Sequence, residues 1–326
     1  MYIEELKFSL WADFIERDYL DNEFKELIDK GIINGATSNP AIFKSAILTS
    51  PAYKEQLASL SHLGAKEKYE VLAIFDIQKA ADILRPLYDA GDDGYVSIEV
   101  DPFLCDDAEA TIAEGKRLHV SINRPNVMIK VPATQAGYEA MEELVASGIA
   151  VNATLIFSKE QALSCAKAFE RGMARSNNSV DTVISVFVSR IDRALDAVLE
   201  SKGIASALAG NYNAASIYNA IEALNVKRCR TLFASTGVKG DTLRASYYVD
   251  ELLAPHSVNT APVETIKAYV SGGDKSAKLP IAEEKIAAFF QEIKTAGIDF
   301  EALIDTQIKD GLEAFKVAFT EILESL

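Results

Sequence analysis

Short apolar segments alternate with amphipathic ones along most of the 326-residue sequence, and this alternation is the strongest constraint on its fold. The apolar segments that we predict as strands lie at residues 8–13, 32–40, 94–102, 126–134, 149–157, 180–190, 230–237 and 248–254. Strands that alternate with helices form parallel sheets, and eight such units are the number that closes a barrel. The sequence therefore predicts an α/β fold, a (β/α)8 TIM barrel.

The domain organisation follows from what the sequence lacks and from its C-terminal pattern. No low-complexity linker divides the chain, and no Gly-rich GxGxxG turn follows the first predicted strand, as a dinucleotide-binding sheet would require. Beyond residue 263 the apolar spacing is helical only, and in residues 312–323 one face carries Leu312, Phe315, Phe319 and Ile322. We expect one domain over 1–326, in which 263–326 is a helical C-terminal extension packed on the barrel.

Composition excludes several classes of partner. The chain has 33 Lys and Arg against 48 Asp and Glu, a net charge of −15, which repels nucleic acids and anionic membranes. Cysteines stand alone without CxxC spacing and no HExxH pattern occurs, so we expect no disulfide framework and no metal site. The N-terminus lacks a signal-peptide core. A soluble cytoplasmic protein is expected, and an anionic ligand would need a local basic cluster.

Lys130 lies in the middle of an otherwise apolar segment, residues 126–134, which Pro132 interrupts. An ammonium group taken out of water is costly, so burial favours the neutral amine, which is a nucleophile toward carbonyl groups. Lys130 is therefore a candidate Schiff-base lysine. A plainer interpretation is a lysine at the end of the strand that reaches solvent or pairs with a carboxylate.

Polar residues fall at the carboxyl ends of the predicted strands, where barrels carry their catalytic side chains. These residues are Asp13, Asn39, Glu99, Lys130, Asn152, Thr154, Ser185, Arg190, Ser235 and Lys239. Buried polar groups are costly, so their gathering at one end of the barrel favours a functional site.

Each of these residues also has a structural interpretation. Asn39 precedes a proline and suits a turn, and Glu99 suits the N-terminus of a helix. Asn152 and Thr154 suit interior positions bonded to the backbone. Arg190 has possible ion-pair partners on its own helix, Asp192 and Asp196.

Five segments together resemble the transaldolase family. They are GATSNP at 35–40, IKVPAT at 129–134, NATLIFS at 152–158, SVFVSRID at 185–192 and ASTGVK at 234–239. They occur in order and, with Asp13, span most of the chain. Familiar members read Ser-Pro-Phe-Val-Gly-Arg in the fourth segment, where this chain has Val186 and Ser189 and keeps Ser185, Phe187 and Arg190.

The resemblance implies a class I, Schiff-base transferase that uses no metal and no cofactor. It would move a dihydroxyacetone unit from a ketose phosphate, fructose 6-phosphate or sedoheptulose 7-phosphate, to an aldose phosphate, glyceraldehyde 3-phosphate or erythrose 4-phosphate. This is carbohydrate metabolism in the pentose phosphate pathway, with sugar phosphates as partners. The chain is expected to be a monomer or a homodimer, and both remain open.

The resemblance also assigns roles at the reacting carbon atoms. Lys130 attacks the ketose carbonyl, Glu99 shuttles protons with a water held by Thr154, and Asp13 takes the proton of the hydroxyl that becomes the aldehyde.

The remaining roles concern binding. Asn39 and Asn152 would bind the three-carbon unit, Ser185 its terminal hydroxyl, and the apolar ring of Phe187 would limit water. A phosphate clamp would consist of Arg190, Ser235 and Lys239.

Three rival functions stay open at this stage. An aldolase of the same superfamily would release dihydroxyacetone instead of transferring it. A barrel that binds sugar phosphates without imine chemistry would keep Arg190 and Lys239 but would have no use for Lys130 beside Glu99. A scaffold protein would leave the polar strand ends unexplained.

Overall fold

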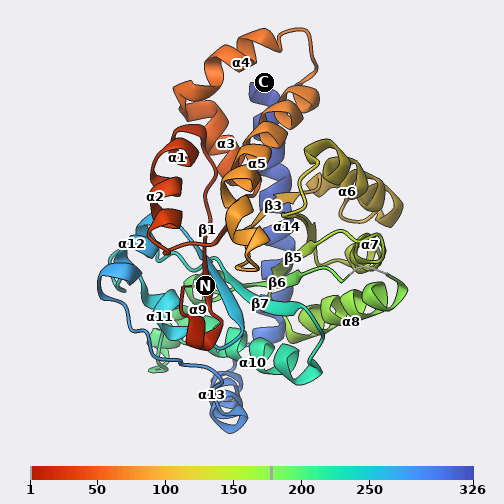
Figure 1. Ribbon diagram of the computed structural model, residues 1–326. Helices are drawn as coiled ribbons and strands as arrows, with labels where there is room; N and C mark the ends of the chain where they lie inside the picture. Colours follow the sequence, from red (N-terminus) through yellow and green to blue (C-terminus); the bar gives the residue numbers. More distant parts are fainter. Residues whose placement is uncertain (1, 177–178) are drawn as a thin grey trace.

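The computed structural model describes residues 2–176 and 179–326, and within these ranges eight parallel strands close into one barrel in sequence order (Figure 1). The strands are β1 (Ser9–Ala12), β2 (Gly35–Ala36), β3 (Tyr95–Glu99), β4 (Val127–Pro132), β5 (Val151–Ile156), β6 (Thr182–Phe187), β7 (Cys229–Ala234) and β8 (Ser257–Ala261). The barrel closes because β8 pairs with β1 as well as with β7. The predicted (β/α)8 fold is confirmed.

Helices connect the strands and cover the outside of the barrel (Figure 1). The helices between β1 and β5 are α1 (Arg17–Asp21), α2 (Glu23–Asp29), α3 (Pro40–Thr49), α4 (Lys54–Ser59), α5 (Ala65–Asp89), α6 (Ala108–Ile122) and α7 (Gln135–Ala146). After β5 come α8 (Lys159–Arg175), α9 (Ser189–Ser201), α10 (Ala209–Leu224), α11 (Tyr247–Glu251), α12 (Val263–Gly272), α13 (Glu283–Thr295) and α14 (Phe300–Ser325). Short 3₁₀ turns are η1 (Glu4–Leu6), η2 (Pro51–Tyr53) and η3 (Pro102–Leu104). No helix of the described ranges is long and apolar enough to cross a membrane.

The eighth strand was predicted in the wrong place. Residues Tyr247–Glu251 form the helix α11, and Leu252 is its C-cap. Every residue of 248–254 except Glu251 is buried, and a short buried apolar run does not by itself distinguish a strand from a helix. The true strand, β8, contains buried polar residues, among them Asn259 and Thr260. Its apolar content is too low to mark it as a strand by sequence pattern.

The second predicted strand was too long. β2 contains only Gly35 and Ala36, and Asn39 with Pro40 begins α3, a helix that the sequence analysis did not predict. The side-chain oxygen of Asn39 accepts a hydrogen bond from Ile42 N at 3.0 Å. An N-cap asparagine followed by proline at the first helical position is a helix start, and this signal was misinterpreted as a strand end.

The predicted C-terminal helices are present, and the last one is the longest. α14 packs against α3, α5, η3, β5 and α9, and runs beside α5 in Figure 1. Its buried residues include Phe315, Phe319 and Ile322, as the apolar spacing predicted. The Phe319 ring meets Tyr69 of α5 edge-on at a centroid distance of 5.1 Å. Through these contacts α14 packs near the carboxyl ends of the strands, and its Phe315 lines the cavity described below.

A buried ion pair joins the first helix to α5. Arg17 Nε lies 2.8 Å from Asp76 Oδ1, and the Asp76 side chain has no exposed surface. The Tyr53 hydroxyl donates to Asp76 Oδ2 at 2.7 Å. Burial raises the pKa of Asp76, while Arg17 and Tyr53 lower it, so the carboxylate depends on these two partners.

Arg17→Met should lower the free energy of unfolding by about 3–5 kcal/mol, because it leaves the Asp76 carboxylate buried without a counter-ion. Lys25→Met is the matched control, because Lys25 pairs with Asp21 at 3.4 Å on the surface, where both side chains are about half exposed. The control should cost less than about 1 kcal/mol. Urea unfolding of both variants measures the difference, and equal losses would contradict a structural role for the buried pair.

Candidate active site

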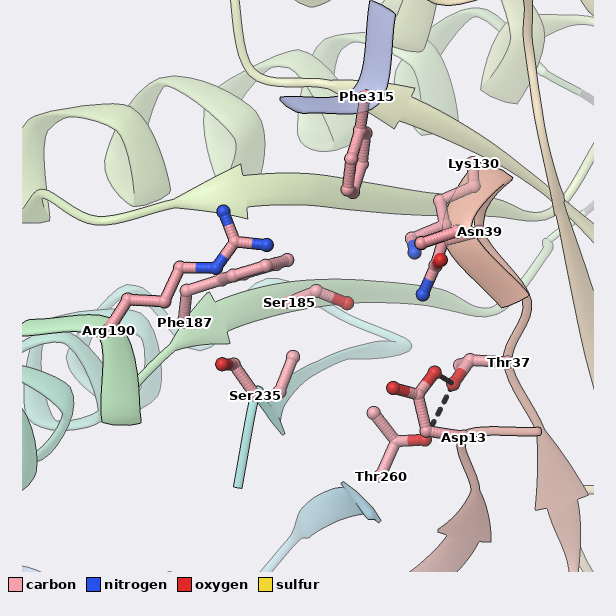
Figure 2. A pocket seen from close by; sticks show the side chains of 12 residues that line it. Asp13, Thr37, Asn39, Lys130, Ser185, Phe187, Arg190, Ser235, Thr260 and Phe315 are labelled. Carbon is pink, nitrogen blue, oxygen red and sulfur yellow. Dashed lines mark hydrogen bonds between the residues drawn. The ribbon is translucent and has the colours of Figure 1, made fainter. Parts of the chain in front are cut away.

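A cavity of about 150 Å³ opens at the carboxyl ends of the strands, where the sequence placed the polar residues (Figure 2). Its lining is Asp13, Thr37, Asn39, Ala41, Lys130, Ser185, Phe187, Arg190, Ala234, Ser235, Thr260 and Phe315. Seven residues of the predicted site therefore meet in one cavity, although they come from five different strands and the loops or helices after them. Glu99 lies beside Lys130 and Asn152 beside Ser185, although neither Glu99 nor Asn152 lines the cavity, and Thr154 and Lys239 also lie outside the lining.

Lys130 projects from β4 and is 5% exposed. Its Nζ donates to the carbonyl oxygen of Ser38 at 3.1 Å and lies 3.6 Å from Glu99 Oε2. The interpretation in which Lys130 reaches solvent is wrong, and the one in which it faces a carboxylate is confirmed. β3 and β4 place the two side chains together because Glu99 and Lys130 are paired in register. The amine thus stands at the wall of the cavity with a carboxyl group beside it.

Glu99 has unusual surroundings for a carboxyl group. Neither of its oxygens has a hydrogen-bond partner among the described residues, and its side chain is 4% exposed. Burial raises the pKa of Glu99 to about 7, against the opposing effect of Lys130. The group can therefore both give and accept a proton near neutral pH.

Thr154 lies on a distorted part of β5. The register of β5 against β6 shifts between Ala153 and Ile156, and Leu155 between them has a left-handed φ of 59°. Leucine rarely adopts this conformation, and bulges of this kind occur next to active sites, where they redirect a side chain. Thr154 Oγ1 is buried without a hydrogen-bond partner in the described chain.

Asn152 was predicted to bind a ligand directly, but it does not line the cavity. It is fully buried, its Nδ2 donates to Ser97 Oγ at 3.0 Å, and its Oδ1 accepts from Ser185 Oγ at 2.6 Å. Ser185 lines the cavity and Asn152 does not. The structure therefore places Asn152 beneath the cavity wall, where it orients Ser185.

Asp13 follows β1 and forms a chain of hydrogen bonds with two threonines (Figure 2). The Thr37 hydroxyl donates to Asp13 Oδ1 at 2.7 Å and lies 2.6 Å from the Thr260 hydroxyl. Burial raises the pKa of Asp13, while Lys130 and the Thr37 hydroxyl lower it. Asn39 lines the same side of the cavity, and its Oδ1 caps α3.

Arg190 is the second residue of α9 and stands at the other end of the cavity from Lys130 (Figure 2). Its Cζ lies 5.0 Å from the centroid of the Phe187 ring, a stacking distance. It forms no ion pair with a carboxylate of the described residues. Asp192 instead accepts from Gly210 N and Asp196 from Ala207 N, so the predicted alternative of a pair on the helix surface is wrong. Burial lowers the pKa of Arg190.

Ser235 follows β7 with a left-handed φ of 55° and holds its hydroxyl 3.1 Å from that of Ser189, next to Arg190. The loop brings Ser235 to the cavity, whereas Lys239 further along it is exposed and does not line the cavity. Of the three predicted clamp residues, the structure brings together Arg190 and Ser235.

Five lining residues were absent from the predicted site: Thr37, Ala41, Ala234, Thr260 and Phe315. Thr37 lies within the GATSNP segment, which could have indicated it. Thr260 lies on the strand that was misplaced, and Phe315 was identified only as an apolar helix residue. Among the described residues, no group of three or more His, Cys, Asp or Glu side chains is arranged to hold a metal ion.

Comparison with known proteins adds an independent result. The family model described as Transaldolase/Fructose-6-phosphate aldolase matches residues 10–326. A protein named Transaldolase from Campylobacter jejuni subsp. jejuni serotype O:23/36 (strain 81-176) is 47% identical over 330 residues, covering 98% of this chain and 99% of that protein. One of the same name from Helicobacter pylori (strain Shi470) is 44% identical over 320 residues, with the same coverage. The chain therefore belongs to the transaldolase/fructose-6-phosphate aldolase family, and it is an enzyme of the transferase class.

Proposed function

We propose that this enzyme transfers a dihydroxyacetone unit between sugar phosphates through a Schiff base on Lys130. The observation that carries the proposal is the pairing of two features in one cavity. A buried amine beside Glu99 stands at one end, and an arginine without a carboxylate partner among the described residues stands at the other. A ketose phosphate has a carbonyl group that can react with the Lys130 amine and a phosphate group that can bind Arg190.

The first step forms the imine. Lys130 attacks the C2 carbonyl of fructose 6-phosphate or sedoheptulose 7-phosphate, giving a carbinolamine that loses water. Each stage moves a proton, and Glu99 has a pKa of about 7, suited to giving and taking it. The unpartnered Thr154 hydroxyl and Glu99 carboxylate are the groups that would hold the water taking part.

The second step breaks the C3–C4 bond. The Asp13 carboxylate takes the proton of the C4 hydroxyl, whose oxygen becomes the aldehyde of the leaving fragment. The bonding electrons move to the protonated imine, and the retained three carbons become an enamine. The Thr37 hydroxyl holds the Asp13 carboxylate in place at 2.7 Å. Addition of the enamine to a new aldehyde, glyceraldehyde 3-phosphate or erythrose 4-phosphate, reverses these movements.

The phosphate would bind at the far end of the cavity. Arg190 presents a planar fork of donors suited to phosphate oxygens, and Ser235 adds a hydroxyl. Lys239, exposed on the same loop, would contribute charge at the rim rather than a contact in the cavity. Asn39 and Ser185 would bind the hydroxyls of the three-carbon unit, and Asn152 would act through Ser185.

Transfer, rather than release of dihydroxyacetone, requires that the enamine survive until the second aldehyde arrives. Water that could protonate it must therefore be kept away. Phe187, 6% exposed and packed against Phe157 at a centroid distance of 5.3 Å, gives the cavity an apolar wall beside Ser185. This supports transfer over the aldolase activity that the family description also names. We further propose that the reaction belongs to the pentose phosphate pathway in the cytoplasm and needs no cofactor.

Lys130→Met should lower the rate of transfer from fructose 6-phosphate to erythrose 4-phosphate by about 10⁴-fold or more, the scale on which loss of a covalent nucleophile acts. Methionine fills similar space without an amine. Lys116→Met is the matched control, because Lys116 forms an ion pair with Glu143 on the surface at 2.9 Å. Full activity in the Lys130 variant would contradict the proposal.

The rate of transfer should fall as the pH drops below about 7, because Glu99 is then protonated and can no longer accept a proton. Glu99→Gln should lower the rate at pH 8 and remove this acidic limb of the profile. Rates measured from pH 5 to 9 for both proteins test the assignment. An acidic limb that persists unchanged in Glu99→Gln would show that another group, such as Asp13, produces it.

A further inference from the structure

The last helix, α14, closes the cavity from outside the barrel. It packs against α3, β5 and α9, the elements that carry or follow Asn39, Thr154 and Arg190. Beyond the cavity it is fastened by an ion pair between Lys44 and Glu321 at 2.6 Å. Two of its residues, Gly311 and Phe315, lie one helical turn apart on the face toward the site.

Phe315 stands over the path between the two ends of the cavity. It is 5% exposed, lines the cavity, and its ring centroid is 5.8 Å from Lys130 Nζ. Figure 2 shows the ring descending from α14 between Lys130 and Arg190, on the opposite side from Asp13. A sugar phosphate held by both Lys130 and Arg190 must therefore pass beside this ring.

Gly311 lets the backbone of α14 approach the arginine. A Cβ at this position would lie 3.1 Å from Leu155 Cδ2 and 3.6 Å from Arg190 Nη1. Glycine inside a helix costs stability relative to alanine, so a glycine here needs a reason. The close packing supplies one, because a side chain at this position would crowd Leu155 and contact the Arg190 guanidinium, which stacks on the Phe187 ring at 5.0 Å.

We propose that Gly311 and Phe315 form a roof over the cavity that controls water access and phosphate binding; this inference rests on the proposed function. Phe315 shields the enamine on Lys130. Without the shield, the enamine carbon takes a proton from water, hydroxide adds to the resulting iminium carbon, and dihydroxyacetone and the free amine are released. Gly311 is a positioning residue that keeps Arg190 aimed along the cavity.

Phe315→Ala should raise the ratio of dihydroxyacetone released to product transferred by about tenfold, the change that corresponds to roughly 1.4 kcal/mol. The ratio is measured with fructose 6-phosphate as donor and erythrose 4-phosphate as acceptor. Phe315→Leu keeps an apolar side chain and should raise the ratio less. Val317→Ala is the control, because Val317 is on the same helix and 46% exposed, and its ratio should equal that of the unchanged enzyme.

An unchanged ratio in Phe315→Leu and Phe315→Ala would overturn the role of the ring. If the alanine variant does not fold, the leucine variant decides alone. An unsubstituted enzyme that transfers nothing would instead contradict the proposed function, so the two failures are distinguishable.

Gly311→Ala tests the positioning role of Gly311. Alanine has a higher helix propensity than glycine, so the substitution should stabilise the helical conformation of α14. The added methyl group would crowd Leu155 at 3.1 Å and restrict the Arg190 guanidinium by van der Waals contact at 3.6 Å, and it should thereby raise KM for fructose 6-phosphate about tenfold. The slower reaction of unphosphorylated fructose should keep its kcat/KM. An unchanged KM for the phosphorylated sugar, or an equal loss for both sugars, would overturn the positioning role, because a merely structural effect does not distinguish the two.

Discussion

The structure depends on one costly arrangement, an amine and a carboxyl group removed together from water. The Lys130 and Glu99 side chains are 6% and 4% exposed and lie 3.6 Å apart. Neither would be stable there alone, because an unpaired buried charge costs several kcal/mol. The register of β3 against β4 sets them side by side, and the carbonyl oxygen of Ser38 accepts a hydrogen bond from Lys130 Nζ at 3.1 Å. The barrel thereby holds an amine and a carboxyl group together at the wall of the cavity.

Arg190 places a positive charge in the same cavity as Lys130. The whole chain carries a net charge of −15, yet Arg190 lies at the cavity without a carboxylate partner in the described part of the chain. Its guanidinium stacks on the Phe187 ring, and Gly311 of α14 lies close to it. A buried guanidinium of this kind favours an anionic group on the ligand. The proposed phosphorylated carbonyl substrate would place its carbonyl at the amine and its phosphate at the guanidinium.

The sequence predicted the parts of the fold that follow from local pattern. Strand–helix alternation gave the barrel, and Lys130 was recognisable because a charged residue in an apolar strand is rare. β8 was missed because Asn259 and Thr260 are buried polar residues, which local pattern reads as a loop. Asn152 proved to support Ser185 from behind, and Phe315 arrives from a helix remote in sequence. Such positions depend on long-range packing that no local pattern contains.

The most direct test of the account is chemical trapping of the imine. The enzyme would be mixed with fructose 6-phosphate, reduced with borohydride, digested and mapped by mass spectrometry. The account predicts a three-carbon adduct on Lys130, which would establish the covalent bond and the retained fragment together. An adduct on another lysine, or none in the folded protein, would contradict it.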